Sequence, residues 1–544
     1  MVNFIFKKQS IRIIFGIYLL IGVYIYKDFG LNIEEHWQRL SGFYWLNYVY
    51  EFFNIELFRG ILIEKYTNAY DPALPNPETY KNYGPTFDLT TALIEVIFNI
   101  KSSKVYFELR HLLIFLIFFL SSIVFYKILL QRFKNKIAIF FGTIFYIISP
   151  RIFGDSFHNN KDILLLSLIV FSIFFIFRYF DNKKILYLIL VALLSAFITS
   201  TRFYGFFIPF TFLILIFMNS KKNILNNFTI SICFLFFYFA FLILHWPLMW
   251  ENPLKTFLML LNNYTKGMTQ YQILFKGDYF YTFNLPIDYV FTWIMISTPI
   301  FLLVLFFLGY LILLKRYFNR LLKIDPKKKH LDLFLGNNEK KDFYIFLNFT
   351  LLMLIIFSFN FGLTSGWRHF YFLHVFIVYI GTFFIQLLFV KLKKNTKYFV
   401  LLFFILTGFV IFDLYKFHPY QSLYFNRLIV DEEKNNYQVD MASLSRIDSL
   451  NKILELEKDT TNEIRVGTAS FTPYENAVDK LDENLKKKFI FTQGNFQDAD
   501  YIYSNMIFEV DTKYNNKYDI PSNFKLVYEK IIDKVLIYKL FKKI

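Results

Sequence analysis

The feature that most constrains this chain is a series of long apolar runs. A membrane-spanning helix needs about 20 mostly apolar residues, and Phe, Leu and Ile supply runs near that length again and again. The first lies near Ile11–Tyr26. The others are Leu112–Tyr126, Ile163–Phe177, Phe203–Met218, Ile230–Leu244, Tyr289–Leu314, Phe343–Phe361, Phe370–Val390 and Tyr398–Leu414. They predict an α-helical polytopic membrane protein with about ten or eleven transmembrane helices.

The composition agrees with a membrane location and argues against a nucleic-acid partner. Hydrophobic residues make up 56% of the chain and charged residues only 19%, whereas about a quarter of a soluble domain is charged. The formal net charge of +17 has a simple explanation, because Lys and Arg accumulate in the cytoplasmic loops of membrane proteins. No basic run alternates with aromatic residues that could stack on bases. We therefore expect a lipid bilayer and no nucleic acid as partner.

Basic clusters lie at alternate connections between the apolar runs, and counting the runs places all of them on one face. The positive-inside rule makes this face cytoplasmic. The clusters are Lys7–Arg12, Lys127–Lys136, Arg178–Lys184, Lys221–Lys222, Lys315–Lys341 and Lys391–Lys397. The N-terminus is then cytoplasmic, and the opposite face holds a long external loop over residues 28–110. We expect a multi-pass protein of the inner (plasma) membrane.

The C-terminal tail has a different composition. Charges occur throughout residues 431–544, and helical patterns cover Ser443–Leu456 and Tyr474–Leu485. Short alternating runs typical of strands are Ile464–Val466, Phe489–Phe491, Tyr501–Tyr503, Lys525–Val527 and Val535–Tyr538. Strands interleaved with helices predict a small α/β domain. We divide the chain into a transmembrane domain, 1–415, and an external C-terminal domain, 416–544.

Two acidic clusters on the external face are candidates for catalysis, because ionisable residues at a membrane are costly and usually functional. Glu34 and Glu35 follow the first span, where by themselves they are better explained as a charged loop cap. Asp155 and Asp162 lie in a short segment between two apolar runs. A tight turn needs only a few polar residues, and the segment 149–162 has more than that.

Cations also occur on the external face, against the charge rule. They are Arg151, Lys161, Arg202, Arg368 and His369. Each one alone could be an anchor that extends its charged end to the membrane surface. Together they supply what a phosphate or diphosphate needs, because guanidinium groups bind such oxygens in a bidentate fork.

With this layout the chain resembles GT-C-fold glycosyltransferases that use lipid-phosphate sugars, in particular the family 39 protein O-mannosyltransferases and the bacterial aminoarabinose transferases. The resemblance covers roughly residues 10–415. Glu34-Glu35 match an Asp-Glu pair in the first external loop of such enzymes, so the usual Asp is replaced by the longer Glu. Asp155 and Asp162 match a second acidic loop. The segment from Arg368 to Tyr371 matches a late Arg followed by an aromatic residue.

The resemblance implies an inverting transfer of a sugar from a polyprenyl-phosphate donor to a lipid, glycan or protein acceptor of the cell envelope. Glu34 would be the general base, Glu35 would support acceptor placement, and Asp155 is the second candidate for the base, with Asp162 beside it. Arg202 and Arg368 would bind the donor phosphate, with Lys161 and His369 as second choices. We expect no cofactor and no metal, since the external loops have no Asp-x-Asp motif.

Other classes of protein share parts of this pattern. A lipid or sugar transporter or flippase also needs many spans, but it would have paired apolar segments broken by Gly or Pro near the bilayer midplane. A polysaccharide polymerase or ligase shares the donor lipid, but it would have its large external loop between late spans, whereas the long loop here is the first. Both alternatives stay open at this stage, as does a purely structural role.

Overall fold

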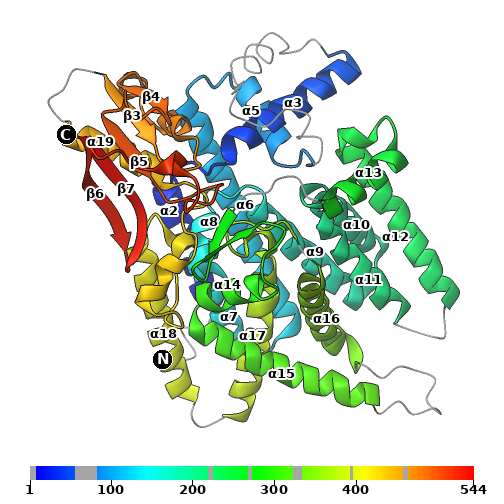
Figure 1. The fold of residues 1–544 in the computed structure, drawn as a ribbon. Coiled ribbons are helices and arrows are strands. Elements are labelled where there is room, and N and C mark those ends of the chain that lie inside the picture. Colours follow the sequence, from blue (N-terminus) through cyan, green and yellow to red (C-terminus); the bar gives the residue numbers. More distant parts are fainter. Residues whose placement is uncertain are drawn as a thin grey trace.

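A computed structural model describes residues 8–55, 83–218, 224–266, 272–322, 334–359, 361–392, 396–457 and 463–544. It shows a helical bundle with a small sheet beside one end of it (Figure 1). Part of the expected external loop, residues 56–82, lies outside the described residues. So do parts of the basic clusters, namely Lys7, Lys221–Lys222, 323–333 and 393–395.

The helices confirm a multi-pass membrane protein. In the described ranges, seven helices are long and apolar enough to cross a membrane. Four more apolar helices are shorter, and the expected ten or eleven spans stay a prediction. The long helices are α6 (Ser103–Arg132), α9 (Asp162–Asn182), α12 (Ile224–His245), α15 (Ile300–Leu322), α16 (Gly336–Ser358), α17 (Leu373–Lys391) and α18 (Thr396–Lys416). The shorter apolar segments, of 10–17 residues, are Gln9–Ile25 within α2 (Lys8–Ile25), α7 (Lys136–Ile148), α10 (Ile185–Thr201) and Phe203–Phe217, which ends in α11 (Phe207–Phe217).

One predicted span is broken in the structure. The run Tyr289–Leu314 divides into α14 (Tyr289–Ser297) and α15, with Thr298 in an extended conformation between them. Pro299 explains the break, because proline has no N–H for the helix and disfavours helical geometry in the residue before it.

The bundle has buried helices at its centre and lipid-facing helices at its edge. Helix α9 packs against α6 and α10, and α17 packs against α7 and α15. Helices α12 and α18 instead expose large apolar side chains such as Phe236 and Phe412. Apolar side chains on the outside of a helix are the pattern that a hydrocarbon environment requires.

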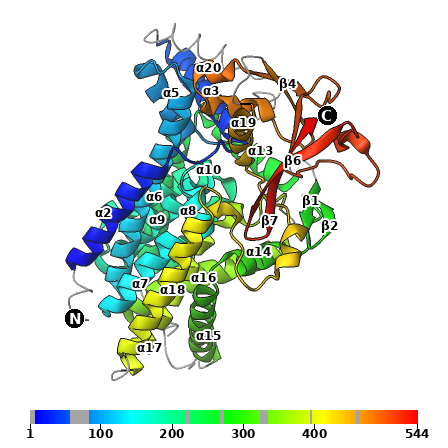
Figure 2. The same ribbon diagram turned by 90° about the vertical axis from the view of Figure 1, so that its left-hand side faces the viewer.

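The non-spanning elements gather at one end of the bundle. Helix α3 (Glu35–Phe53) packs against α5 (Asp88–Ile97). Both lie at the same end as the C-terminal sheet, whereas the N-terminal end of α2 lies at the opposite end (Figure 2). Helix α13 (Pro253–Lys266) and the hairpin of β1 (Gln272–Phe275) and β2 (Asp278–Tyr281) complete these elements.

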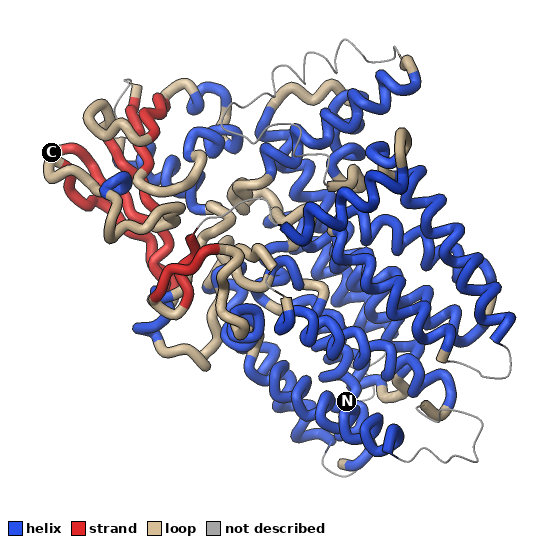
Figure 3. The backbone as a smooth tube through the Cα atoms, turned by 45° about the vertical axis from the view of Figure 1, so that its right-hand side comes forward, coloured by secondary structure: helices blue, strands red, loops and turns tan. Residues whose placement is uncertain are grey.

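The C-terminal region forms a five-stranded sheet on one side of the molecule (Figure 3). Its strands are β3 (Ile464–Thr468), β4 (Phe489–Gln493), β5 (Tyr501–Ser504), β6 (Phe524–Ile532) and β7 (Val535–Lys543). The order is β4-β3-β5-β7-β6, with β3 parallel to β4 and β5 and the other pairs antiparallel. Every predicted strand is present. The division of the chain at residue 415 stays a proposal.

Helical structure in this region agrees only in part with the sequence prediction. Helix α19 (Ser445–Leu456) is present, but the expected helix over Tyr474–Leu485 is a 3-10 segment, η8 (Tyr474–Lys480), followed by the single turn α20 (Glu483–Lys486). Leu481 is extended between them and buried in the core beside the sheet. The helical pattern is therefore interrupted at Leu481, where the chain is extended.

Candidate active site

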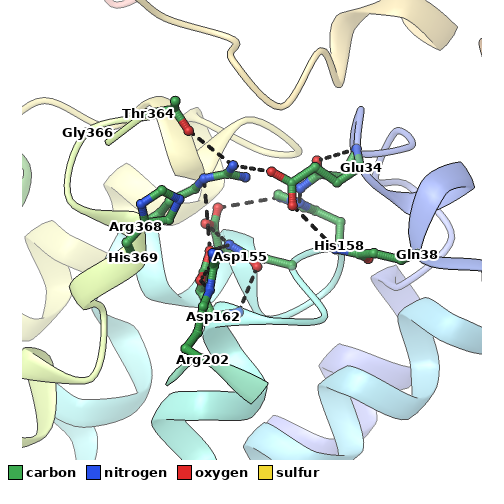
Figure 4. Close-up of polar contacts among 12 residues, drawn as sticks. Glu34, Gln38, Asp155, His158, Asp162, Arg202, Thr364, Gly366, Arg368 and His369 are labelled. Carbon is green, nitrogen blue, oxygen red and sulfur yellow. Dashed lines mark hydrogen bonds and ion pairs between the residues drawn. The ribbon is translucent and has the colours of Figure 1, made fainter. Parts of the chain in front are cut away.

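Most of the polar residues singled out in the sequence, though not Glu35, meet between the bundle and the C-terminal region (Figure 4). Each stands at or next to the end of a helix, where side chains leave the apolar environment. Glu34 caps α3, Asp155 ends the short helix α8 (Pro150–Asp155), Asp162 begins α9, Arg202 caps α10, and Arg368 and His369 form the 3-10 turn η5 (Arg368–Phe370). The structure therefore brings together residues separated by more than 300 positions.

Glu34 lies among cations. Its carboxylate accepts a hydrogen bond from Arg368 Nη2 and one from Gln38 Nε2 at 3.4 Å. Burial by itself would raise the pKa of Glu34, but the charges of Arg368, Lys161 and Arg202 outweigh that effect and hold the pKa well below its usual range. The Glu34 side chain is still 30% exposed. It is an ionised carboxylate that a ligand can reach.

Glu35 has different surroundings although it follows Glu34 directly. It is fully buried, and its two carboxylate oxygens lie 3.0 and 3.1 Å from His111 Nε2 on α6. Burial raises the pKa of Glu35, but His111 more than compensates and the pKa is lowered overall. In this structure Glu35 joins α3 to α6. Sequence reasoning missed His111, whose only signal was an ionisable residue at the start of an apolar run.

The second acidic cluster is linked by hydrogen bonds through Asn159. Asn159 Nδ2 donates to Asp155 Oδ2 at 3.2 Å and to Asp162 Oδ2 at 3.1 Å. His158 Nε2 lies 3.6 Å from Asp155 Oδ1. All four side chains are buried. Asn159 therefore fixes the distance between the two aspartates, a role that only the folded structure reveals.

Asp162 also orients the arginines. Arg202 donates to Asp162 Oδ1 through Nη2 at 2.7 Å and through Nε at 3.2 Å, and Arg368 Nε lies 4.0 Å from Asp162 Oδ2. Arg368 Nη2 also donates to Thr364 Oγ1 at 3.2 Å. Asp162 and Thr364 therefore help to hold the two guanidinium groups in place.

The two second-choice phosphate ligands differ in charge. The Lys161 ammonium lies 3.9 Å from the ring centroids of both Trp37 and Tyr83, and burial lowers the pKa of Lys161 to about 8. Burial lowers the pKa of His369 to about 3, so its imidazole is neutral at pH 7. Lys161 can supply a charge to an anion, whereas His369 can supply only a hydrogen bond.

A pocket lies beside Asp155 and Arg368, and its walls come from both parts of the chain. The helical part contributes Asn32, Arg151, Asp155, Asn159, Arg368 and Tyr371, and the segment Gln438–Ala442 forms another wall. Arg151 stacks over the Trp293 ring at 4.8 Å. Nothing in the sequence indicated that Gln438–Ala442 would lie here.

Gly366 allows the turn before Arg368 to pass close to this pocket. Its φ of +68° is one that glycine adopts without strain. A Cβ atom at this position would meet Trp293 at 3.0 Å and Arg151 Nη1 at 3.3 Å. The absence of a side chain is therefore what lets this turn pack against the residues that line the pocket.

In the described part of the chain, no group of three or more His, Cys, Asp or Glu side chains could hold a metal ion. The expectation that the protein needs neither a metal nor another cofactor stays a prediction.

A family of known proteins matches part of this chain, including several of the charged residues described above. Residues 84–250 match the sequence model of the family described as dolichyl-phosphate-mannose-protein mannosyltransferase. The matched segment contains Asp155, Lys161, Asp162 and Arg202. This segment is thus similar to a family of glycosyltransferases, which, with the helical membrane architecture, favours an enzyme over the transporter and structural alternatives. No curated protein sequence matches the chain.

Solved structures similar to this chain include two of ArnT from Cupriavidus metallidurans. The structure bound to undecaprenyl phosphate is 8% identical with a TM-score of 0.46, and the apo structure is 9% identical with a TM-score of 0.48. Each match covers 98% of both chains. The apo oligosaccharyltransferase of Archaeoglobus fulgidus is 12% identical with a TM-score of 0.46, over 92% of this chain and 70% of that one.

Proposed function

We propose that this protein transfers a sugar from a polyprenyl-phosphate donor to an acceptor at the external face of the inner membrane. The observation that carries the proposal is the setting of Glu34, an ionised carboxylate beside Lys161, Arg202 and Arg368 at the ends of apolar helices. The carboxylate suits a general base. The cations suit the phosphate of a leaving group that carries a lipid chain.

The donor class is supported by the matching family, whose name contains dolichyl-phosphate mannose, a sugar on a polyprenyl phosphate. The charges beside Glu34 agree with it. Arg202 and Arg368 offer guanidinium forks, which bind phosphate oxygens bidentately. The acceptor is a lipid, a glycan or a protein segment with a hydroxyl or an amine.

The reaction is a single displacement that inverts the anomeric centre. The acceptor oxygen or nitrogen forms a bond to the anomeric carbon while the bond from that carbon to the phosphate oxygen breaks. The electron pair of the broken bond leaves with the polyprenyl phosphate, and Lys161, Arg202 and Arg368 stabilise the negative charge. Glu34 accepts the acceptor proton as the new bond forms.

Donor binding activates the base in this scheme. Without a ligand, Arg368 pairs with Glu34 and the surrounding cations make this carboxylate a weak base. A donor phosphate competes for the same guanidinium and adds negative charge nearby, so it releases Glu34 and raises its basicity. A general base works best with a pKa near the working pH, and the donor moves Glu34 in that direction.

The orientation follows from the basic clusters and the arrangement of the ends. The N-terminal end of α2 and the C-terminal sheet lie at opposite ends of the molecule (Figure 2). If the basic loops face the cytoplasm, the N-terminus is cytoplasmic and the C-terminal domain is external. The residues around Glu34 then face outward.

The proposal is tested with the purified protein in sealed vesicles and polyprenyl-phosphate donors that differ in their sugar. We expect at least one donor to lose its sugar and release polyprenyl phosphate. Turnover should occur with donor on the vesicle side that carries the C-terminal domain, as mapped by protease access. Donors that bind without turnover when acceptor lipids, glycans and peptides are supplied would contradict the proposal. Turnover from the opposite side would contradict the orientation.

We expect polyprenyl-phosphate binding to weaken above about pH 8. Lys161 has a pKa lowered to about 8 by burial, so it is charged below that pH and neutral above it, while arginine stays charged throughout. A bound phosphate favours the charged form, so the Kd should rise by up to about tenfold per pH unit above pH 8. Calorimetric titration with undecaprenyl phosphate over several pH values measures this.

Lys161→Met should remove this pH dependence and weaken binding at neutral pH. Lys255→Met is the matched control, because Lys255 is exposed on α13 away from Glu34, and it should bind as the unaltered protein does. A Kd that does not change with pH on the basic side would mean that Lys161 does not contact the phosphate.

A further inference from the structure

The segment that carries Glu34 has little regular structure of its own. Residues Phe29–Asn32, between α2 and α3, belong to no helix or strand, and we call Phe29–Glu34 the Glu34 linker. Glu34 N donates to Asn32 Oδ1 at 3.2 Å, which is a contact within the linker. The position of the Glu34 carboxylate therefore depends on what holds the linker from outside.

Residues of the C-terminal region contact the backbone of the Glu34 linker at Gly30, Leu31 and Ile33. Ile33 N donates to the Ala442 carbonyl at 2.8 Å, and Arg446 Nη2 donates to the Leu31 carbonyl at 2.9 Å. Gly30 packs so closely that a Cβ atom there would lie 2.2 Å from the Leu444 carbonyl oxygen. These contacts fix the linker between α2 and α3 at the level of its peptide groups.

The same region also holds the helices on both sides of the linker. His36 Nε2, in the first turn of α3, lies 2.8 Å from Asp479 Oδ2. Lys480 Nζ donates to the Lys27 carbonyl, just after α2, at 3.0 Å. The Glu34 linker is thus clamped by residues more than 400 positions away, and its geometry is a property of the C-terminal region.

Arg446 is the centre of this clamp. Its side chain is only 1% exposed, and besides Leu31 it donates to the carbonyls of Ser443, at 2.9 Å, and of Pro473. A buried guanidinium is costly unless its N–H groups are hydrogen-bonded, and here they join α19, the segment before η8 and the Glu34 linker. An apolar side chain could fill this space but could not fix three backbone carbonyls.

We propose that Arg446 is a positioning residue for the transfer reaction, which sets through Leu31 where the Glu34 carboxylate lies relative to Arg368 and the pocket. This inference rests on the proposed function. Asn32 of the linker lines the same pocket as Arg368, with Gln438–Ala442 as another wall. Because a displacement of about 1 Å at a reacting group can reduce turnover about 100-fold, loss of this contact should affect the chemical step.

Arg446→Met tests the inference by separating turnover from binding. We expect kcat to fall about 100-fold, while the Kd for undecaprenyl phosphate changes less than about threefold because Lys161 and Arg202 lie outside the clamp. The number of molecules that bind undecaprenyl phosphate is determined by titration, and turnover is divided by this number. A loss of folded protein then does not lower the measured kcat. Arg446→Lys should recover part of kcat, since its ammonium can still donate to one carbonyl.

Arg465→Met is the matched control, because Arg465 is an exposed arginine of β3 in the same region, and it should turn over normally. Gly30→Ala disturbs the clamp from the other side, because its new Cβ atom would push on Leu444, and it should also lower kcat more than binding. Normal kcat in both Arg446→Met and Gly30→Ala would overturn the inference, and so would equal losses of kcat and affinity. Inactivity of the unaltered protein with every donor would instead count against the proposed function.

Discussion

Glu34→Gln is expected to reduce sugar transfer by at least about a hundredfold, the scale of a lost general base. The amide has nearly the shape of the carboxylate but cannot accept the acceptor proton. Binding of undecaprenyl phosphate should be unchanged or tighter, because Arg368 no longer has a charged partner in Glu34. Release of polyprenyl phosphate from the donor measures the first effect, and calorimetric titration measures the second.

Two further substitutions make this result specific. Glu51→Gln alters an exposed carboxylate on the same helix, α3, whose partner is Asn47, and it should leave transfer unchanged. Glu35→Gln removes the partner of His111, so it should lower the amount of folded protein more than the turnover of each folded molecule. Full transfer in Glu34→Gln would eliminate Glu34 as the base and leave Asp155 as the remaining candidate.

The contrast between Glu34 and Glu35 shows where sequence reasoning ends. Successive residues at the start of a helix point about 100° apart, so neighbours in sequence face different surroundings. Glu34 faces Arg368, and Glu35 faces His111 on α6. The sequence alone could identify an acidic pair at an external loop, but which carboxylate faces the cations depends on the packing of α3 against α6.

Much of the fold follows from local patterns. Apolar length predicted the spans, and short alternating runs predicted each strand from β3 to β7. The observed helices differ from the predicted ones at two single residues: Pro299 lies within an apolar run, and the buried Leu481 lies within a helical pattern. In both places the helix that the surrounding pattern predicts is interrupted at one position.

The sequence predicted which charged residues form the candidate site, but not which of them pair with one another. Lys161, Asp162, Arg202 and Arg368 were evident because charged residues are unusual beside apolar spans. Which of these groups pair with one another, and which stay available to a ligand, depends on distances that only the folded chain defines. The clamp by Arg446 had no sequence signal at all, because its acceptors are backbone carbonyls and every residue has one.

Arg368→Ala should have the second large effect, and it should differ in kind from that of Glu34→Gln. The substitution removes a guanidinium near the leaving phosphate, so we expect both a weaker affinity for undecaprenyl phosphate and a kcat lower by about 100- to 1,000-fold, the scale of a lost charge-stabilising donor. Glu34 also loses the partner that lowers its pKa most, so the remaining activity should decline at a higher pH on the acidic side than in the unaltered protein.

Arg368→Lys and Arg427→Ala give this result its controls. Lysine keeps the positive charge without the fork, so Arg368→Lys should fall between the unaltered protein and the alanine variant. Arg427, an exposed arginine between α18 and α19, should be replaceable without effect. Because Arg368 and Glu34 form an ion pair, the losses in the double variant should be smaller than the product of the single losses. Multiplicative losses would show that the two side chains act independently of each other.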